Sequence, residues 1–307
     1  MIRLGMYSEQ FSKEYLEVVR KKVSKELQDK ILKSCMIYMP KDFFDTNEDE
    51  FEQLILAEFP KLKKAYEYIN ANTHSKMEYE CFSCNNNKKT YNDMYNEYVD
   101  KYTKVSQSEY DGRKMSVRMV EELDLTICPY CNREYINSRD EDCAGAQLDH
   151  FYNKSTYPIF SLCLYNLVPV CGNCNRIKSS KKCDFASPFD LDIDFDNGLK
   201  FSLLTDGDDI TRIHIVVNED CKKLKNNISE MKIENSYQIH RKDVLELQKK
   251  LKQYSDTQLQ EMFKITNIPA IQIKEMIFGP KIDSNIMKNK TLGRMLHDLQ
   301  EIYKIFE

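Results

Sequence analysis

Four cysteines of this chain occur as two pairs with identical spacing. Cys128-Pro-Tyr-Cys131 is the first pair and Cys171-Gly-Asn-Cys174 is the second. Structural zinc sites use thiolate ligands in a tetrahedron, and a spacing of two residues lets both thiolates of one turn reach the same ion. The segment 132–170 is longer than the connection in a simple zinc ribbon, so it must fold as an insertion. We therefore predict a structural Zn²⁺ site formed by all four cysteines.

A second set of residues near these cysteines has the types that phosphodiester hydrolysis requires. That reaction needs a water nucleophile, a base that deprotonates it and a cation that stabilises negative charge on the phosphate. Mg²⁺ or Mn²⁺ would take oxygen ligands, which Asp149 and the side-chain amide of Asn175 can supply. His150, with an unperturbed pKa of about 6.5, is suited to act as the base. We expect activity to rise between about pH 6 and pH 7 as His150 deprotonates.

These residues can share one cleft only if the local backbone allows it. In a regular strand Asp149 and His150 would point to opposite faces, so the strand must end or bend there. The asparagine, serine and proline that follow favour such an interruption. Cys171–Lys181 is expected to begin a helix in which Asn175 lies about 100° around the axis from Cys174. Cys174 can then face the zinc ion while Asn175 faces the cleft.

Basic residues are concentrated around the same segment. Between residues 151 and 182 the chain has five basic residues and no acidic residue. Lys178 follows Asn175 by three residues, so a helix would place both on one face, where Lys178 could contact a phosphate. A local positive surface is compatible with the net charge of −4, because binding responds to charges within a Debye length of about 8 Å. The predicted nucleic-acid-binding residues are Lys154, Arg176, Lys178, Lys181 and Lys182.

The composition of the chain is typical of a soluble protein. It has 307 residues, of which 41% are hydrophobic and 31% are charged. The beginning of the sequence lacks the apolar core of a signal peptide, and no apolar run reaches the roughly eighteen residues that can span a membrane. The eleven cysteines are expected to be reduced, because a secretion signal is missing and several have metal-binding spacing. We therefore expect a cytoplasmic protein without membrane contact.

A third cysteine pair, Cys81-Phe-Ser-Cys84, has no obvious second half in the sequence. Cys143 and Cys183 could complete a site with it only if the fold brought them together. A redox or metal role for Cys81 and Cys84 stays open, and ordinary thiols are the favoured interpretation.

Helices are expected on both sides of the central segment. From Phe11 to about Leu123 hydrophobic residues recur every three or four positions, and Asn218–Glu307 shows the same period. The polar residues Asn85–Lys89 are expected to form a loop within the first of these regions. These patterns divide the chain into a helical region 1–124, a central module 125–218 and a helical region 219–307.

An alternating pattern after position 190 predicts strands. Apolar residues at 191, 193 and 195 alternate with aspartates and precede Asn197-Gly198, which is typical of a tight hairpin turn. Leu199–Leu204 and Ile210–Val217 would complete a small antiparallel β-meander. The aspartates also suggest a calcium loop, in which glycine comes one position after the third acidic residue, whereas Gly198 comes two positions after Asp196. This mismatch favours a solvated strand face over calcium binding.

The central segment resembles the HNH endonuclease family, whose ββα-metal module holds one divalent ion. The matching text is Cys128-x-x-Cys131, Leu148-Asp149-His150-Phe151, Asn166-Leu167-Val168-Pro169 and Cys171-x-x-Cys174-Asn175-x-x-Lys178. The resemblance covers about a fifth of the chain, from Leu125 to roughly Pro188. It implies an α+β fold, with a central ββα-metal module and its four-cysteine zinc site flanked by helical regions.

The resemblance also implies a role for each matching side chain. His150 would be the general base, and Asp149 beside it would bind the catalytic metal ion. Asn166 would hold the loop and help to position the base. Asn175 would be the other protein ligand of the Mg²⁺ or Mn²⁺ ion.

The resulting expectation is a metal-dependent endonuclease that hydrolyses DNA through a water molecule activated by His150. The segment 149–158 is similar to HNH proteins that act as effectors in bacterial antiphage systems, often beside a separate ATPase, and this implies such a partner. An RNA-cleaving nuclease stays open, because the catalytic set acts on a phosphate and does not choose the sugar. So does a non-catalytic zinc-ribbon module that binds nucleic acid.

Overall fold

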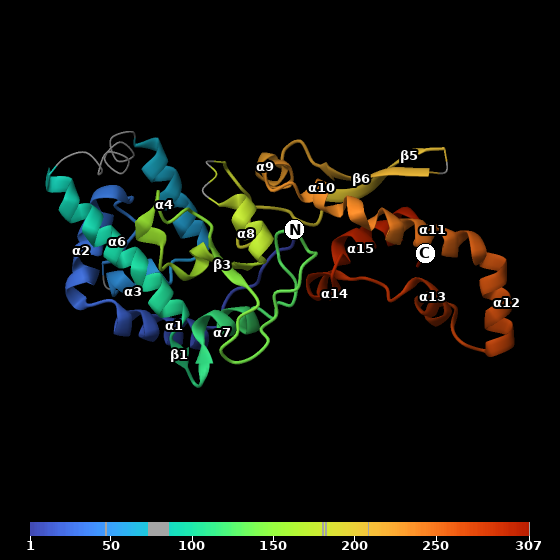
Figure 1. The fold of residues 1–307 in the computed structure, drawn as a ribbon, viewed down its shortest axis with the longest axis horizontal. Helices are drawn as coiled ribbons and strands as arrows, with labels where there is room; N and C mark the ends of the chain where they lie inside the picture. Colours follow the sequence, from blue (N-terminus) through green and yellow to red (C-terminus); the bar gives the residue numbers. More distant parts are fainter. Residues whose placement is uncertain (47, 73–85, 180, 182, 208, 307) are drawn as a thin grey trace.

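The computed structural model describes residues 1–46, 48–72, 86–179, 181, 183–207 and 209–306, with only the backbone for 86–92, 209 and 284 (Figure 1). Helices dominate the N-terminal region, as predicted. Three of them begin at a side-chain cap, in which the oxygen of Ser8, Ser24 or Asp49 accepts a hydrogen bond from a free backbone N–H of the first turn. The helices are α1 (Glu9–Lys22), α2 (Lys25–Tyr38), α3 (Glu50–Ile55), α4 (Phe59–Ala71), α6 (Asn86–Ser106) and α7 (Met115–Glu122).

The loop expected at Asn85–Lys89 is wrong for residues 86–89, because α6 begins at Asn86. Asn85 itself lies outside the described residues. Farther along α6, Tyr95 and Tyr98 are buried, and the helix packs against α1 and α2. Tertiary packing of this kind overrides the weak helix propensity of a polar first turn. A small hairpin, β1 (Glu109–Tyr110) with β2 (Arg113–Lys114), follows α6 and was not predicted.

The centre of the fold is an antiparallel strand pair followed by a short helix (Figure 1). Strand β3 (Gln147–His150) pairs with β4 (Leu167–Val170), so that His150 lies opposite Leu167. Two short 3₁₀ turns, Pro158–Phe160 and Leu164–Asn166, lie in the connection between the strands. Helix α8 (Gly172–Lys178) follows β4 directly and contacts β3. The mixed helical and sheet architecture is therefore confirmed.

The predicted three-stranded meander is a two-stranded hairpin. Strands β5 (Leu199–Asp206) and β6 (Asp209–Val217) pair antiparallel close to the expected positions. The strand expected at 191–195 is wrong, because residues 191–192 and 195–197 form turns and no strand lies between them. The Asp190 and Asp194 carboxylates accept hydrogen bonds from the backbone N–H two residues later, which favours turns over a strand. Asp190 and Asp192 also form ion pairs with Lys63.

The C-terminal region is helical, as predicted; several of its helices pack against the β5–β6 hairpin, and α12 and α13 lie at one end of the molecule (Figure 1). Arg294, in the last helix, is buried and donates hydrogen bonds to the carbonyl oxygens of Phe195, Asp196 and Leu199. The helices are α9 (Lys222–Glu230), α10 (Ile233–Tyr237), α11 (Arg241–Gln253), α12 (Asp256–Thr266), α13 (Ala270–Phe278), α14 (Ser284–Asn289) and α15 (Gly293–Ile302).

One cluster of buried side chains contains residues of all three predicted regions, with Phe11, Tyr130 and Met295 as examples. The central strand pair therefore shares its hydrophobic core with helices from both flanking regions. Among the helices in the described ranges, none is both long and apolar enough to cross a membrane.

Candidate metal centre and adjoining cleft

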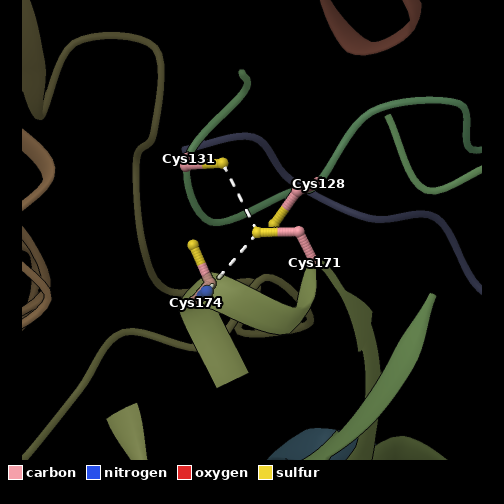
Figure 2. Close-up of side chains that lie close together, drawn as sticks. All are labelled: Cys128, Cys131, Cys171 and Cys174. Atoms are coloured by element: carbon pink, nitrogen blue, oxygen red, sulfur yellow. Dashed lines mark hydrogen bonds between the residues drawn. The ribbon is translucent and has the colours of Figure 1, made fainter. Parts of the chain in front are cut away.

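The four predicted cysteines converge in the interior, with their sulfur atoms directed toward one another (Figure 2). All four sulfur atoms lie within 4.8 Å of one another, and those of Cys131 and Cys171 are 3.9 Å apart. A tetrahedral zinc ion with Zn–S bonds of about 2.3 Å requires sulfur atoms roughly 3.8 Å apart. None of the four is in a disulfide bond. The donor set and its spacing therefore fit a structural zinc ion.

Local backbone geometry explains how each pair forms half of this cluster. In the first pair, the N–H of Cys128 donates to the Glu134 carbonyl, and the N–H of Asn132 donates back to the Cys128 carbonyl. Asn132 adopts a left-handed conformation with φ of 52°, which asparagine tolerates well. We call residues 128–132 the knuckle. In the second pair, Cys171 is the N-cap of α8, and its sulfur atom accepts a hydrogen bond from the N–H of Cys174.

The interior position has a consequence for the charge of the thiols. Burial raises the pKa of the Cys128 thiol well above its ordinary value, whereas hydrogen bonds among the neighbouring thiols raise the pKa of Cys174 and lower that of Cys131. Four thiolates cannot share this volume without a cation, because their mutual repulsion and desolvation are unfavourable. A bound Zn²⁺ ion would supply that charge and release protons from the thiols.

Contacts from distant parts of the chain surround the knuckle. Ile2 donates a backbone hydrogen bond to the Pro129 carbonyl, and the N–H groups of Leu292 and Arg294 donate to Asn132. The hydroxyl of the buried Tyr237 donates to the Cys131 carbonyl over 2.7 Å. The cluster thus lies where the N-terminal segment and the C-terminal helices meet.

Asp149, at the end of β3, is 3% exposed. Its Oδ2 atom accepts a hydrogen bond of 2.7 Å from the Tyr130 hydroxyl. The Lys178 ammonium lies 2.9 Å from Oδ2 and 3.2 Å from Oδ1. A carboxylate has about four acceptor positions, so these partners leave acceptor capacity for a metal ion.

Lys178, which we expected to contact a phosphate, points into the protein and is 2% exposed. Its ammonium also donates to the carbonyl oxygens of His150 and Phe151. The physical reason is the buried Asp149 carboxylate, which requires a nearby cation. Lys178 in this position holds the end of β3 and does not form part of the surface.

His150 has one ring nitrogen fixed by the backbone. Its Nε2 atom lies 3.1 Å from the carbonyl oxygen of Ser161. A carbonyl oxygen only accepts hydrogen bonds, so Nε2 carries the proton and Nδ1 is the basic nitrogen. The Tyr102 ring packs edge-on against the imidazole, with 4.4 Å between ring centroids. The tautomer is therefore the one in which Nδ1 can accept a proton.

The electrostatic environment keeps this imidazole neutral. Burial lowers the pKa of His150 to about 3, and repulsion from Lys154 acts in the same direction. The predicted rise in activity between about pH 6 and pH 7 used the unperturbed pKa, whereas the pKa of this partly buried imidazole is lowered. A bound phosphate would raise the pKa again, because a nearby negative charge favours the imidazolium.

Asn166 is fully buried and ties together the two ends of the β3–β4 connection. Its side-chain oxygen accepts from the N–H of Tyr152, and its side-chain nitrogen donates to the carbonyl oxygens of Phe160 and Tyr152. Its own backbone carbonyl accepts from Phe151. These bonds fix the backbone that carries His150 on one side and Ser161 on the other.

A cleft with a volume of about 750 Å³ brings several predicted residues together. Asp149, His150 and Asn175 all line it, and Lys154 lies on the same wall. Asn175, on α8, donates its side-chain N–H to Gln147 over 2.9 Å. This bond uses the amide nitrogen and orients the amide group between α8 and β3. The cleft therefore places a carboxylate, an amide and a basic imidazole in one depression.

The predicted basic residues that the structure describes have different surroundings, and Lys178 among them is buried. The Lys154 ammonium lies over the Tyr102 ring in the cleft wall, 5.1 Å from the ring centroid. Exposed Arg176 donates to Asn173, and Lys181 pairs with Glu230. Lys182 lies outside the described residues.

Two side chains that contact Asp149 and His150 were missed by the sequence analysis. Tyr130 lies between Cys128 and Cys131 in the sequence, so its side chain can contact residues that pack beside the four-cysteine cluster, such as Asp149. Tyr102 comes from α6, and nothing in its sequence context indicates the contact with His150. Cys81 and Cys84 lie outside the described residues. Cys143 is exposed at the cleft, and Cys183 is half-buried elsewhere.

A second group of metal-binding residue types occurs on α15, where His297, Asp298 and Glu301 lie close together. Asp298 is already paired with Arg294, and Glu301 with Lys200. This arrangement is explained by the ion pairs alone.

No protein-family model, curated protein or solved structure matches this chain.

Proposed function

We propose that this protein is a metal-dependent endonuclease of the HNH type that hydrolyses phosphodiester bonds in DNA. The observation that carries the proposal is the state of His150. Its Nε2 proton is committed to the Ser161 carbonyl, and the side chain borders the cleft that also contains Asp149 and Asn175. A neutral imidazole with a fixed tautomer is suited to take a proton from an attacking water.

The roles of the other residues follow from their chemistry. Asp149 and Asn175 would hold a Mg²⁺ or Mn²⁺ ion, because both line the same cleft and both have side-chain oxygen atoms. Such an ion, when bound, stabilises negative charge on the phosphate. Asn166 keeps the backbone on both sides of His150 in place, and the four cysteines would bind structural zinc. The order of two antiparallel strands and a helix around these residues supports a ββα-metal module.

The test is cleavage of supercoiled plasmid in the presence of Mg²⁺ or Mn²⁺ by wild type and by His150→Ala. We expect nicked or linear product from wild type and none from the variant. His214→Ala is the matched control. His214 is a partly exposed histidine on β6 that pairs with Glu234, and it does not line the cleft. Equal zinc content must be verified for all three proteins. Cleavage by His150→Ala at the wild-type rate would refute the assigned role.

The same experiment with labelled RNA distinguishes the substrates. Preferential cleavage of RNA would replace DNA in the proposal and leave the catalytic roles unchanged. A requirement for an ATPase partner, a role in antiphage defence and a cytoplasmic location are predictions from the sequence. Purification of the native complex without an ATPase would count against such a partner.

A further inference from the structure

Tyr130 connects the four-cysteine cluster to the cleft. It lies within the knuckle, between Cys128 and Cys131, and its side chain is fully buried. Its hydroxyl group is 2.7 Å from the Oδ2 atom of Asp149. The knuckle backbone and the cleft carboxylate are therefore joined by one side chain.

The direction of this hydrogen bond is fixed by chemistry. An ionised carboxylate can only accept, so the Tyr130 hydroxyl must donate. A hydrogen bond to a charged acceptor is stronger than one between neutral groups. The contact can therefore restrain the orientation of the carboxylate.

The second restraint on Asp149 comes from the other cysteine pair. Lys178 is at the end of α8, the helix that begins directly after Cys171 and contains Cys174. Tyr130 thus holds Asp149 from the first pair, and Lys178 holds it from the second. An ion bound by all four cysteines would fix the knuckle relative to α8, and with them the two groups that hold the carboxylate.

We propose that Tyr130 is a positioning residue through which the four-cysteine site orients the Asp149 carboxylate and sets its affinity for a divalent ion in the cleft. This inference rests on the proposed function, because it assigns Asp149 the role of metal ligand. Partners that orient a metal ligand commonly change metal affinity by about 10- to 100-fold.

Tyr237 supplies a matched control. Like Tyr130 it is a buried tyrosine at the knuckle, and its hydroxyl also donates over 2.7 Å. Its acceptor, however, is the backbone carbonyl of Cys131, not a cleft carboxylate. Tyr130→Phe and Tyr237→Phe each remove one buried hydroxyl beside the cysteines while keeping the ring. A difference in Mn²⁺ affinity between the two variants therefore reports on the contact with Asp149, because both variants lose a buried hydroxyl beside the knuckle.

The experiment measures Mn²⁺ binding by calorimetry, without nucleic acid, for both variants and for wild type loaded with one zinc ion. Asp149→Asn defines the signal from the cleft and should remove it. We expect Tyr130→Phe to bind Mn²⁺ about tenfold more weakly than wild type, with unchanged zinc content. Tyr237→Phe should bind Mn²⁺ within roughly twofold of wild type, because its hydroxyl does not contact the ligand.

Other outcomes would overturn the inference. Wild-type affinity in Tyr130→Phe, equal losses in both tyrosine variants, or no Asp149-dependent Mn²⁺ binding in wild type would each do so. Failure of the proposed function has a different signature. A wild type that binds Mn²⁺ but cleaves neither DNA nor RNA would refute nuclease activity, while a selective loss in Tyr130→Phe would still support the positioning role.

Discussion

Replacement of Lys178 with methionine would remove the only positive charge that the described residues place within ion-pair distance of Asp149. Methionine approximates the length of the aliphatic stem and can keep contact with Phe151 and Phe185, whose rings lie near the ammonium. Removal of one partner from a buried ion pair typically costs about 3–5 kcal/mol. The carbonyl groups of His150 and Phe151 also lose a donor, so we expect a loss of unfolding free energy in the upper part of this range.

The assay is urea unfolding followed by circular dichroism at pH 7. The free zinc concentration must be held constant, because zinc binding to the folded protein adds to its apparent stability. Lys200→Met is the matched control. Lys200 pairs with Glu301 at the surface, where both side chains are about half exposed, so its loss should cost less than about 1 kcal/mol.

A double variant separates the charge effect from packing. Asp149→Asn combined with Lys178→Met removes both charges and should be more stable than Lys178→Met alone, because no unpaired carboxylate remains buried. The reasoning would be refuted if Lys178→Met lost no more stability than Lys200→Met. It would also be refuted if the two substitutions were additive, so that the double variant had a lower unfolding free energy than Lys178→Met by the amount that Asp149→Asn costs alone.

Three further predictions concern His150, Asn166 and the four cysteines. Because burial lowers the pKa of His150 to about 3, the imidazole is neutral from pH 5 to pH 8, so kcat/KM for cleavage should show no rise centred near pH 6.5. Such a rise would show that the free enzyme holds His150 exposed. Asn166→Ala should lower the unfolding free energy in urea by about 2–3 kcal/mol, since buried groups of Tyr152 and Phe160 lose their partner; a change below about 0.5 kcal/mol would contradict this. Removal of zinc by a chelator should lower the melting temperature, and added zinc should restore it, whereas Cys128→Ser should melt low under both conditions.

The sequence predicted the parts of the site that depend on ligand chemistry. Two cysteine pairs of equal spacing have few uses in a reduced protein besides a shared metal ion, and the four thiols do converge. The helical start after Cys171 also placed Asn175 beside the same cleft as Asp149. Short-range geometry was sufficient within each half, because the two cysteines of a pair lie on one turn and Asn175 comes directly after Cys174.

The direction of Lys178 was not predicted, although its spacing contained the information. Lys178 is three residues from Asn175 and four from Cys174, so a helix permits either face. The buried face was adopted because Asp149, on a different strand, needs a cation in the interior. Such a choice depends on a partner from outside the helix, which local periodicity does not contain.

The strand expected at 191–195 failed for a related reason. Alternating apolar and acidic residues satisfy the pattern of a half-buried strand, but aspartate side chains can also cap the backbone two residues later. Asp190 and Asp194 do so, and Lys63 from α4 pairs with the intervening Asp192. A tertiary ion pair and local capping together outweighed the alternation.

The contacts between the knuckle and the two ends of the chain have a consequence for the order of folding. Arg294 and Asn132 are separated by 162 positions, so their hydrogen bond closes a very long loop. Closure of such loops is entropically costly and slow compared with the pairing of the cysteines, which are close in sequence. We expect zinc to organise residues 128–174 first and to create the surface on which α15 docks last. Pulse-labelling hydrogen exchange during refolding should accordingly protect amides of α8 before those of α15.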